Sequence, residues 1–159
     1  MAAGTPAACG RKDFVVEPYQ VSEAQTYVKL QEQPVLRVLV VDDNVDAAKA
    51  LAMLLGYFKC DVEVAFDGES ALSAAEHAEP HVGILDLGLP RIDGFELARR
   101  IRRLPWGKRT MLIALSGWGQ QEDRVRSREA GFDLHLVKPV DSQALLKILD
   151  TVRGQLPSE

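Results

Sequence analysis

Three aspartates stand where apolar runs stop in this 159-residue chain. Asp42 and Asp43 follow the largely aliphatic run 35–41, and Asp86 follows the run 82–85. A carboxylate at the end of a buried run is costly unless it is paired, hydrogen-bonded or bound to a metal. We therefore interpret these acids as members of a functional site.

Two further polar residues follow apolar runs in the same way. Ser116 comes after the run 111–115, and Lys138 comes after the run 134–137. If the runs are parallel strands, their carboxyl ends lie at one edge of a sheet, where ligand sites form in such folds. The sequence therefore predicts that all five polar residues meet at this edge.

The chemistry of this set points to a cation and a phosphoryl group. Three close carboxylates raise one another's pKa unless a cation lies among them. Oxygen ligands without a His or Cys cluster favour Mg²⁺, with Mn²⁺ as the alternative. Mg²⁺ commonly shares its coordination with phosphate oxygens. Ser116 could then donate a hydrogen bond to the phosphoryl group and Lys138 could supply positive charge, while one carboxylate attacks phosphorus.

The elements that must hold these residues alternate along the chain. Continuous aliphatic runs are typical of strands buried on both faces of a parallel sheet, and each parallel return needs a crossover helix. We predict an α/β fold, a doubly wound five-stranded parallel sheet with helices on both faces. The predicted strands are 35–41, 62–66, 82–85, 111–115 and 134–137, and helices begin near Asn44, Asp67, Asp93, Gln120 and Asp141 or Ser142.

Composition limits the domain organisation and the class of partner. We predict one domain at 35–154, with 1–34 as an N-terminal tail or linker containing a short helix near Ser22 and 155–159 as a C-terminal tail. A net charge of -4 gives no broad basic surface for nucleic acid. No apolar run is long enough to span a membrane and no signal peptide is present, so we expect a cytoplasmic protein.

Two groups of residues are expected to be solvated. His77 and His81 flank Pro80 and have no partner at metal-binding spacing. A basic run falls on the helix that begins near Asp93, and charge on a helix is most often a solvated face. A docking role is the minority alternative for this run, which consists of Arg99, Arg100, Arg102 and Arg103.

The chain resembles the receiver domain of two-component response regulators over about residues 35 to 153. The resemblance is carried by Val40-Val41-Asp42-Asp43-Asn44, by Leu85-Asp86-Leu87-Gly88-Leu89-Pro90 with Asp93-Gly94, by Leu115-Ser116-Gly117 and by Val137-Lys138-Pro139. It implies a flavodoxin-like sheet with strand order 2-1-3-4-5. The stretch from Gly131 to Asp141 is similar to receivers at the C-termini of hybrid sensor histidine kinases.

The resemblance also implies a role for each matched residue. Asp86 corresponds to the phosphoacceptor, and Ser116 and Lys138 to the switch hydroxyl and the site lysine. A cis peptide bond is expected before Pro139. The Mg²⁺ ligands implied are Asp42, Asp43, Asp86 and the backbone carbonyl of Gly88.

Two positions depart from the family pattern. Many members have Tyr or Phe three residues before the lysine as a rotating switch, whereas this chain has His135, whose charge depends on pH. Trp118 is bulky for a position beside the phosphoryl site. We predict that it restricts water access and slows loss of phosphate, so that Trp118→Ala speeds dephosphorylation.

The sequence thus predicts a signalling switch, and not an enzyme beyond its own phosphotransfer and dephosphorylation. A histidine kinase or histidine phosphotransfer protein would phosphorylate it, and it would bind an unidentified output protein as a monomer or weak homodimer. No DNA-binding domain or membrane segment is expected in the chain. The alternatives are a Mg²⁺-dependent aspartyl-phosphate phosphatase, which would need a general acid where Gly88 stands, and a degenerate receiver acting only as a protein-interaction module.

Overall fold

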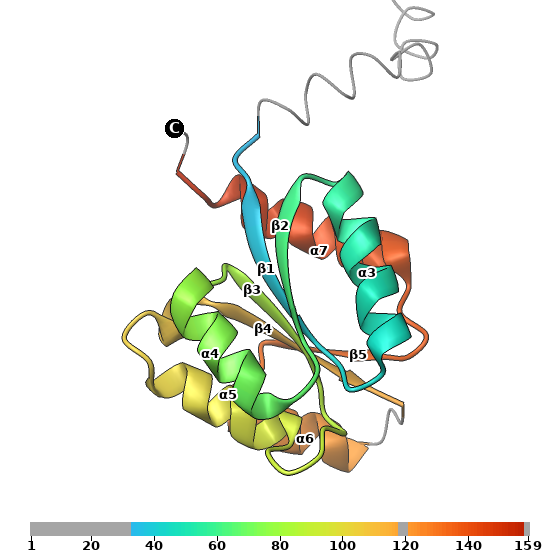
Figure 1. The fold of residues 1–159 in the computed structure, drawn as a ribbon, viewed down its shortest axis with the longest axis vertical. Helices are drawn as coiled ribbons and strands as arrows, with labels where there is room; N and C mark the ends of the chain where they lie inside the picture. Colours follow the sequence, from blue (N-terminus) through green and yellow to red (C-terminus); the bar gives the residue numbers. More distant parts are fainter. Residues whose placement is uncertain (1–32, 118–120, 158–159) are drawn as a thin grey trace, which may run out of the picture. The chain divides into compact units, whose positions relative to one another are not determined.

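The computed structural model describes residues 33–117 and 121–157. Within them, strands and helices alternate as the sequence predicts (Figure 1). The strands are β1 Leu36–Val41, β2 Cys60–Ala65, β3 Val82–Asp86, β4 Met111–Ser116 and β5 Leu134–Val137. The helices are α3 Val45–Tyr57, α4 Gly68–Ala78, α5 Gly94–Arg103, the single-turn 3-10 helix η2 Gly107–Arg109, α6 Gln121–Ala130 and α7 Ser142–Gly154.

All strand pairs are parallel, and the order is β2-β1-β3-β4-β5, which confirms the predicted topology. Helices α3 and α7 cover one face of the sheet, and α4, α5 and α6 cover the other (Figure 1). Because side chains alternate along a strand, β1 contributes Val38 and Val40 to the core under α3 and α7. It contributes Leu39 and Val41 to the core under the other three helices.

Helices α3, α4, α5 and α7 begin where predicted, and each starts beside a residue that caps it. Asn44 accepts a hydrogen bond from the Ala47 N–H, and Asp67, Asp93 and Asp141 accept equivalent bonds at the starts of α4, α5 and α7. Each bond satisfies a backbone donor that the first helical turn leaves without a partner. The least accurate boundary is that of β2, which begins at Cys60 because it pairs with β1 from Leu36 onward.

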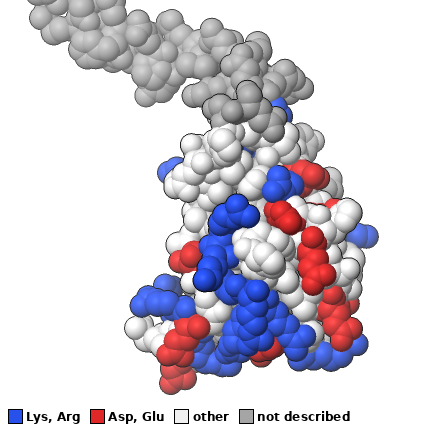
Figure 2. Space-filling model, turned by 90° about the vertical axis from the view of Figure 1, so that its left-hand side faces the viewer, with Lys and Arg blue, Asp and Glu red and all other residues white. Residues whose placement is uncertain are grey.

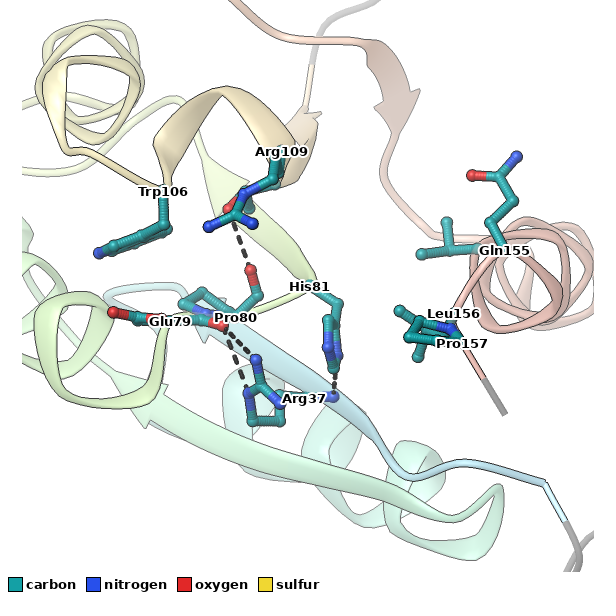
Figure 3. A pocket seen from close by; sticks show the side chains of 11 residues that line it. Arg37, Glu79, Pro80, His81, Trp106, Arg109, Gln155, Leu156 and Pro157 are labelled. Carbon is teal, nitrogen blue, oxygen red and sulfur yellow. Dashed lines mark hydrogen bonds between the residues drawn. The ribbon is translucent and has the colours of Figure 1, made fainter. Parts of the chain in front are cut away.

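Two predictions of solvated residues are wrong at the N-terminal edge of the sheet, and Figure 3 shows one of these residues, His81. His81 is half-buried, and its Nδ1 accepts a hydrogen bond from the Arg37 backbone N–H at 2.9 Å. Arg102 donates to the carbonyls of Gly107, Thr110 and Gly131. Exposure was predicted correctly for His77, Arg99, Arg100 and Arg103.

The predictions about membrane segments, the domain and the N-terminal tail have different outcomes. No helix in residues 33–117 and 121–157 is long and apolar enough to cross a membrane. The described residues from Pro34 onward belong to one compact unit. The predicted short helix near Ser22 lies outside the described residues, and the boundaries at 34 and 154 stay predictions.

Candidate functional site

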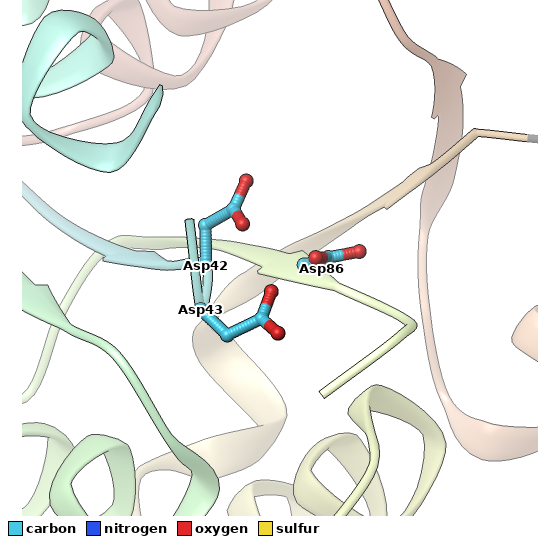
Figure 4. Close-up of side chains that lie close together, drawn as sticks. All are labelled: Asp42, Asp43 and Asp86. Atoms are coloured by element: carbon cyan, nitrogen blue, oxygen red, sulfur yellow. The ribbon is translucent and has the colours of Figure 1, made fainter. Parts of the chain in front are cut away.

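The structure brings the strand-end residues together as predicted. Asp42 and Asp43 follow β1, Asp86 ends β3, Ser116 ends β4 and Lys138 follows β5. These strands are neighbours in the sheet. Figure 4 shows the three aspartate side chains in one region, and one carboxylate oxygen from each lies within 4.8 Å of the others. The three carboxylates are therefore close together in space, although Asp86 is distant from Asp42 and Asp43 in the sequence.

Asp42 is fixed by a partner on each side. Its side chain is buried, and its Oδ1 accepts a hydrogen bond from the Asn44 backbone N–H at 2.9 Å. Its Oδ2 lies 2.9 Å from the ammonium Nζ of Lys138. Because Asn44 caps α3, Asp42 is not needed as a helix cap. Asp43, in contrast, is exposed, so its carboxylate is the more accessible of the pair.

Asp86 is a buried carboxylate with a shifted protonation equilibrium. Its Oδ1 accepts a hydrogen bond from the Gly88 N–H at 3.1 Å, and its Oδ2 lies 3.3 Å from Lys138 Nζ. Burial raises the pKa of Asp86 above its usual value, and the negative charge of Asp42 adds to this, although Gly88 and Lys138 act in the opposite direction.

Lys138 supplies the positive charge within this group. Burial lowers the pKa of Lys138, but the hydrogen bond to Asp42 and the charges of Asp42 and Asp86 outweigh this, so the net shift is upward. The side chain is thus held as an ammonium. One ammonium among three carboxylates leaves the cluster with excess negative charge when all are ionised, which favours binding of a cation.

Ser116 and His135 are joined by a short hydrogen bond. Ser116 Oγ lies 2.7 Å from His135 Nε2, and His135 Nδ1 lies 3.2 Å from Ser127 Oγ. The Ser127 hydroxyl donates to the Arg124 carbonyl, so its oxygen can only accept from Nδ1–H. In a neutral imidazole Nε2 is then the acceptor for the Ser116 hydroxyl. Burial and, next, the charge of Arg124 lower the pKa of His135, which favours this neutral form.

Backbone features hold the remaining predicted residues in place. The Lys138–Pro139 peptide bond is cis, as expected, and the Lys138 N–H donates to the Ser116 carbonyl at 2.8 Å. The N–H of Gly88 contacts Asp86, while the predicted role of the Gly88 carbonyl stays a prediction. Trp118 lies outside the described residues.

Two residues that support the site were not identified as such from sequence. Gly94 is required because a Cβ there would lie 2.4 Å from the Asp86 carbonyl oxygen, so α5 begins in direct contact with the end of β3. Ser127 is buried and orients His135. The pair Asp93-Gly94 gives a helix-start signal, but nothing in the polar stretch around Ser127 distinguishes it from its neighbours.

Comparison with known proteins agrees with this geometry. The family model for the response regulator receiver domain matches residues 38–150. The chain is 30% identical over 128 residues to Protein PilG of Pseudomonas aeruginosa, covering 80% of this chain and 93% of that protein.

Solved structures show the same similarity. The chemotaxis response regulator CheY4 of Vibrio cholerae superimposes with a TM-score of 0.70 at 31% identity, covering 75% of this chain and 99% of that chain. The receiver domain of a Pseudomonas aeruginosa sensor histidine kinase, described with a magnesium ion coordinated in its active site cleft, has a TM-score of 0.70 at 30% identity. It covers 77% of this chain and 100% of that one.

Proposed function

Because the chain belongs to the response regulator receiver domain family, we propose that Asp86 accepts a phosphoryl group from a phosphohistidine on a histidine kinase or histidine phosphotransfer protein. In this transfer the P–N bond of the donor breaks and a P–O bond forms to the Asp86 carboxylate. The product changes a surface that binds an output protein, as in a signalling switch.

The donor atoms fit Mg²⁺, with Mn²⁺ as the alternative. The three carboxylates of Asp42, Asp43 and Asp86 offer oxygen atoms within 4.8 Å of one another, and among the described residues no His or Cys joins this group. We assign the backbone carbonyl of Gly88 as a further ligand. The ion would neutralise negative charge that develops on the transferring phosphoryl oxygens.

Lys138 and Ser116 have separate roles next to Asp86. Lys138 lies 3.3 Å from the Asp86 carboxylate and is positioned to pair with a phosphoryl oxygen once the carboxylate is esterified. Ser116 must redirect the hydroxyl hydrogen that it donates to His135 if it is to donate to the phosphoryl group. Phosphorylation would then leave His135 without its Ser116 partner, which couples Asp86 to the surface formed by α6 and β5.

One observation carries the proposal: a buried carboxylate, Asp86, shares Lys138 with Asp42 at the carboxyl edge of the sheet. The test is incubation of the full chain with Mg²⁺ and acetyl phosphate, followed by intact-mass measurement. The parent should gain the mass of one phosphoryl group, and Asp86→Asn should not. Asp61→Asn, which removes an exposed carboxylate from β2, should behave as the parent.

The same experiment can contradict Asp86 as the acceptor and Mg²⁺ as the cofactor. Phosphoryl incorporation by Asp86→Asn at the parental level would exclude Asp86 as the acceptor. Loss of incorporation in Asp61→Asn would show that the assay reports a general effect of carboxylate removal. Omission of Mg²⁺ should abolish incorporation in the parent, and incorporation unaffected by chelation would remove the metal from the proposal.

A further inference from the structure

Two neighbouring helices carry opposite charges on their outer surfaces. Glu69 and Glu76 stand two helical turns apart on α4, and Glu79 follows the helix; all three are exposed and form the acidic ridge. The basic ridge on α5 consists of the exposed residues Arg99, Arg100 and Arg103. Figure 2 shows Lys and Arg side chains gathered beside a column of Asp and Glu on this face.

The two ridges do not neutralise each other within one copy. Helices α4 and α5 contact each other, yet no ion pair joins a residue of one ridge to a residue of the other among the described residues. Arg99 and Arg100 both pair with Glu96 on their own helix, at 3.3 and 3.0 Å. A single carboxylate thus serves two guanidinium groups, and the basic ridge keeps excess positive charge.

We propose that this face is the interface of a homodimer. A two-fold axis that lies in the face and runs parallel to the ridges exchanges left and right. It therefore places the acidic ridge of one copy against the basic ridge of the other, and the reverse pair forms at the same time. Such an axis leaves the position of each residue along the helix direction unchanged. Glu76 and Arg103 both lie near the C-terminal ends of their helices.

The arrangement of charge favours a second copy over a polyanion. The basic ridge lies between the exposed glutamates of α4 and helix α6, on which exposed Glu122 and Glu129 are accompanied by exposed Arg124, Arg126 and Arg128. A nucleic acid or an anionic membrane that covered the basic ridge would also approach the acidic ridge on α4, which would repel it. A second copy related by the two-fold axis meets both signs of charge in complementary positions.

The dimer should be weak and sensitive to salt, because exposed ion pairs each contribute no more than about 1 kcal/mol. The test is sedimentation velocity on the unphosphorylated full chain over a concentration series reaching about 500 µM. At about 25 mM salt the dimer fraction should rise with concentration, and at about 500 mM salt the dissociation constant should increase by about tenfold or more. A parent that stays monomeric throughout the low-salt series would overturn the proposal.

Charge-swapped variants test the face itself. Arg100→Glu with Arg103→Glu reverses the charge at two of the three positions of the basic ridge, and Glu69→Lys with Glu76→Lys does the same for the acidic ridge. Each variant should dissociate at least about tenfold more readily than the parent, while an equal mixture of the two should form a heterodimer. Circular dichroism of each variant confirms that it is folded. Failure of two folded variants to associate on mixing would contradict the proposed pairing.

A matched control separates the face from net charge. Lys49→Glu with Lys147→Glu makes the same change in net charge, but both lysines are exposed on α3 and α7, across the sheet from the ridges. This control should dimerise like the parent. The milder pair Arg100→Gln with Arg103→Gln should lie between the parent and the reversed variant. An equal loss in the control would show that only overall charge governs association. Asp86 is unmodified throughout, so these results are independent of the proposed phosphotransfer.

Discussion

Buried polar groups gather at both edges of the sheet, but they are used differently. At the carboxyl edge, side chains meet other side chains: Lys138 contacts Asp42 and Asp86. At the N-terminal edge, most side-chain hydrogen bonds go to backbone atoms. Arg37 donates to the carbonyls of Ala78 and Glu79, and Thr110 donates to that of Pro80. The first edge keeps excess negative charge that can bind and react, whereas the second joins elements of the fold.

A cavity does not by itself make the N-terminal edge a reactive site. A cavity of about 450 Å³ lies there, and Arg37, His81 and Thr110 are among the residues that line it (Figure 3). Each of these three side chains is already hydrogen-bonded to the backbone. The carboxyl edge, in contrast, combines three carboxylates with one ammonium group. The comparison therefore predicts that substitutions at the carboxyl edge change chemistry and that substitutions at the N-terminal edge change stability.

The largest effect on chemistry besides that of Asp86 is expected at Lys138. Lys138→Ala removes the ammonium group next to Asp42 and Asp86, so negative charge on the incoming phosphoryl group would lose its neighbouring cation. We expect the rate of phosphorylation by acetyl phosphate to fall by about 100-fold or more. Intact-mass time courses measure this rate. Lys147→Ala, an exposed lysine on α7, is the control, and a parental rate in Lys138→Ala would refute the division between the edges.

Arg102 should give the largest loss of stability at the N-terminal edge. Its guanidinium group donates to three backbone carbonyls and forms an ion pair with Asp133 at 2.8 Å. Arg102→Ala leaves these carbonyls without a charged donor and should lower the free energy of unfolding by about 2–4 kcal/mol. Urea denaturation measures the loss. The exposed Arg103→Ala should change stability by less than about 0.5 kcal/mol.

Arg102→Ala also tests whether the N-terminal edge influences phosphorylation. While it remains folded, Arg102→Ala should be phosphorylated at the parental rate, because it lies at the opposite edge from Asp86. A lower rate in the folded protein would show that the two edges are coupled. A stability equal to that of the parent would show that the carbonyls find other donors or water, contrary to a structural role.

The features that sequence predicted correctly are those with local causes. Asp42, Asp86, Ser116 and Lys138 each follow an apolar run, so the topology of a parallel sheet is sufficient to bring them together. Helix caps depend on a residue and the N–H groups a few positions later. Both kinds of signal can be read directly from neighbouring residues.

The predictions that were wrong concern residues whose partners are distant in sequence. Arg102 interacts with Gly131, and His81 interacts with Arg37, although neither pair shares a periodic pattern. Both residues therefore resemble ordinary polar surface in a linear pattern. The link from His135 to Ser127 has the same cause: it requires the relative placement of α6 and β5. Long side chains that bind backbone atoms are the class least accessible to this kind of prediction.

A smaller effect is expected from the charge of Asp86 on stability. Burial raises the pKa of Asp86, so the folded state binds its proton more readily than the unfolded state does. The stability from this proton is present below the unfolded pKa and is lost as pH rises through the folded pKa. Without Mg²⁺, Asp86→Asn should therefore be more stable than the parent at neutral pH, with a difference that shrinks in acid. Urea denaturation over a pH series measures it, and a less stable variant at neutral pH would contradict a destabilising carboxylate.

The smallest effect should come from His81, which tests whether the N-terminal edge is structural in detail. Its Nδ1 accepts from the Arg37 N–H, and burial and the charge of Arg37 lower its pKa. His81→Leu leaves this backbone donor without its acceptor, and the expected loss of stability at pH 8 is about 1 kcal/mol. A lowered pKa means that the stability from neutral His81 is present above the unfolded pKa and is lost as pH falls through the folded pKa.

The parent should therefore lose stability relative to His81→Leu between about pH 8 and pH 5, which reverses the pH dependence expected from Asp86. His81→Asn offers a side-chain oxygen as an acceptor that does not titrate. It should keep most of the parental stability at high pH and should not show the acid loss. Urea denaturation at both pH values measures these differences. Phosphorylation rates should be equal in all three proteins, because His81 stabilises the contact between the starts of β1 and β3 and does not contribute to the carboxyl edge.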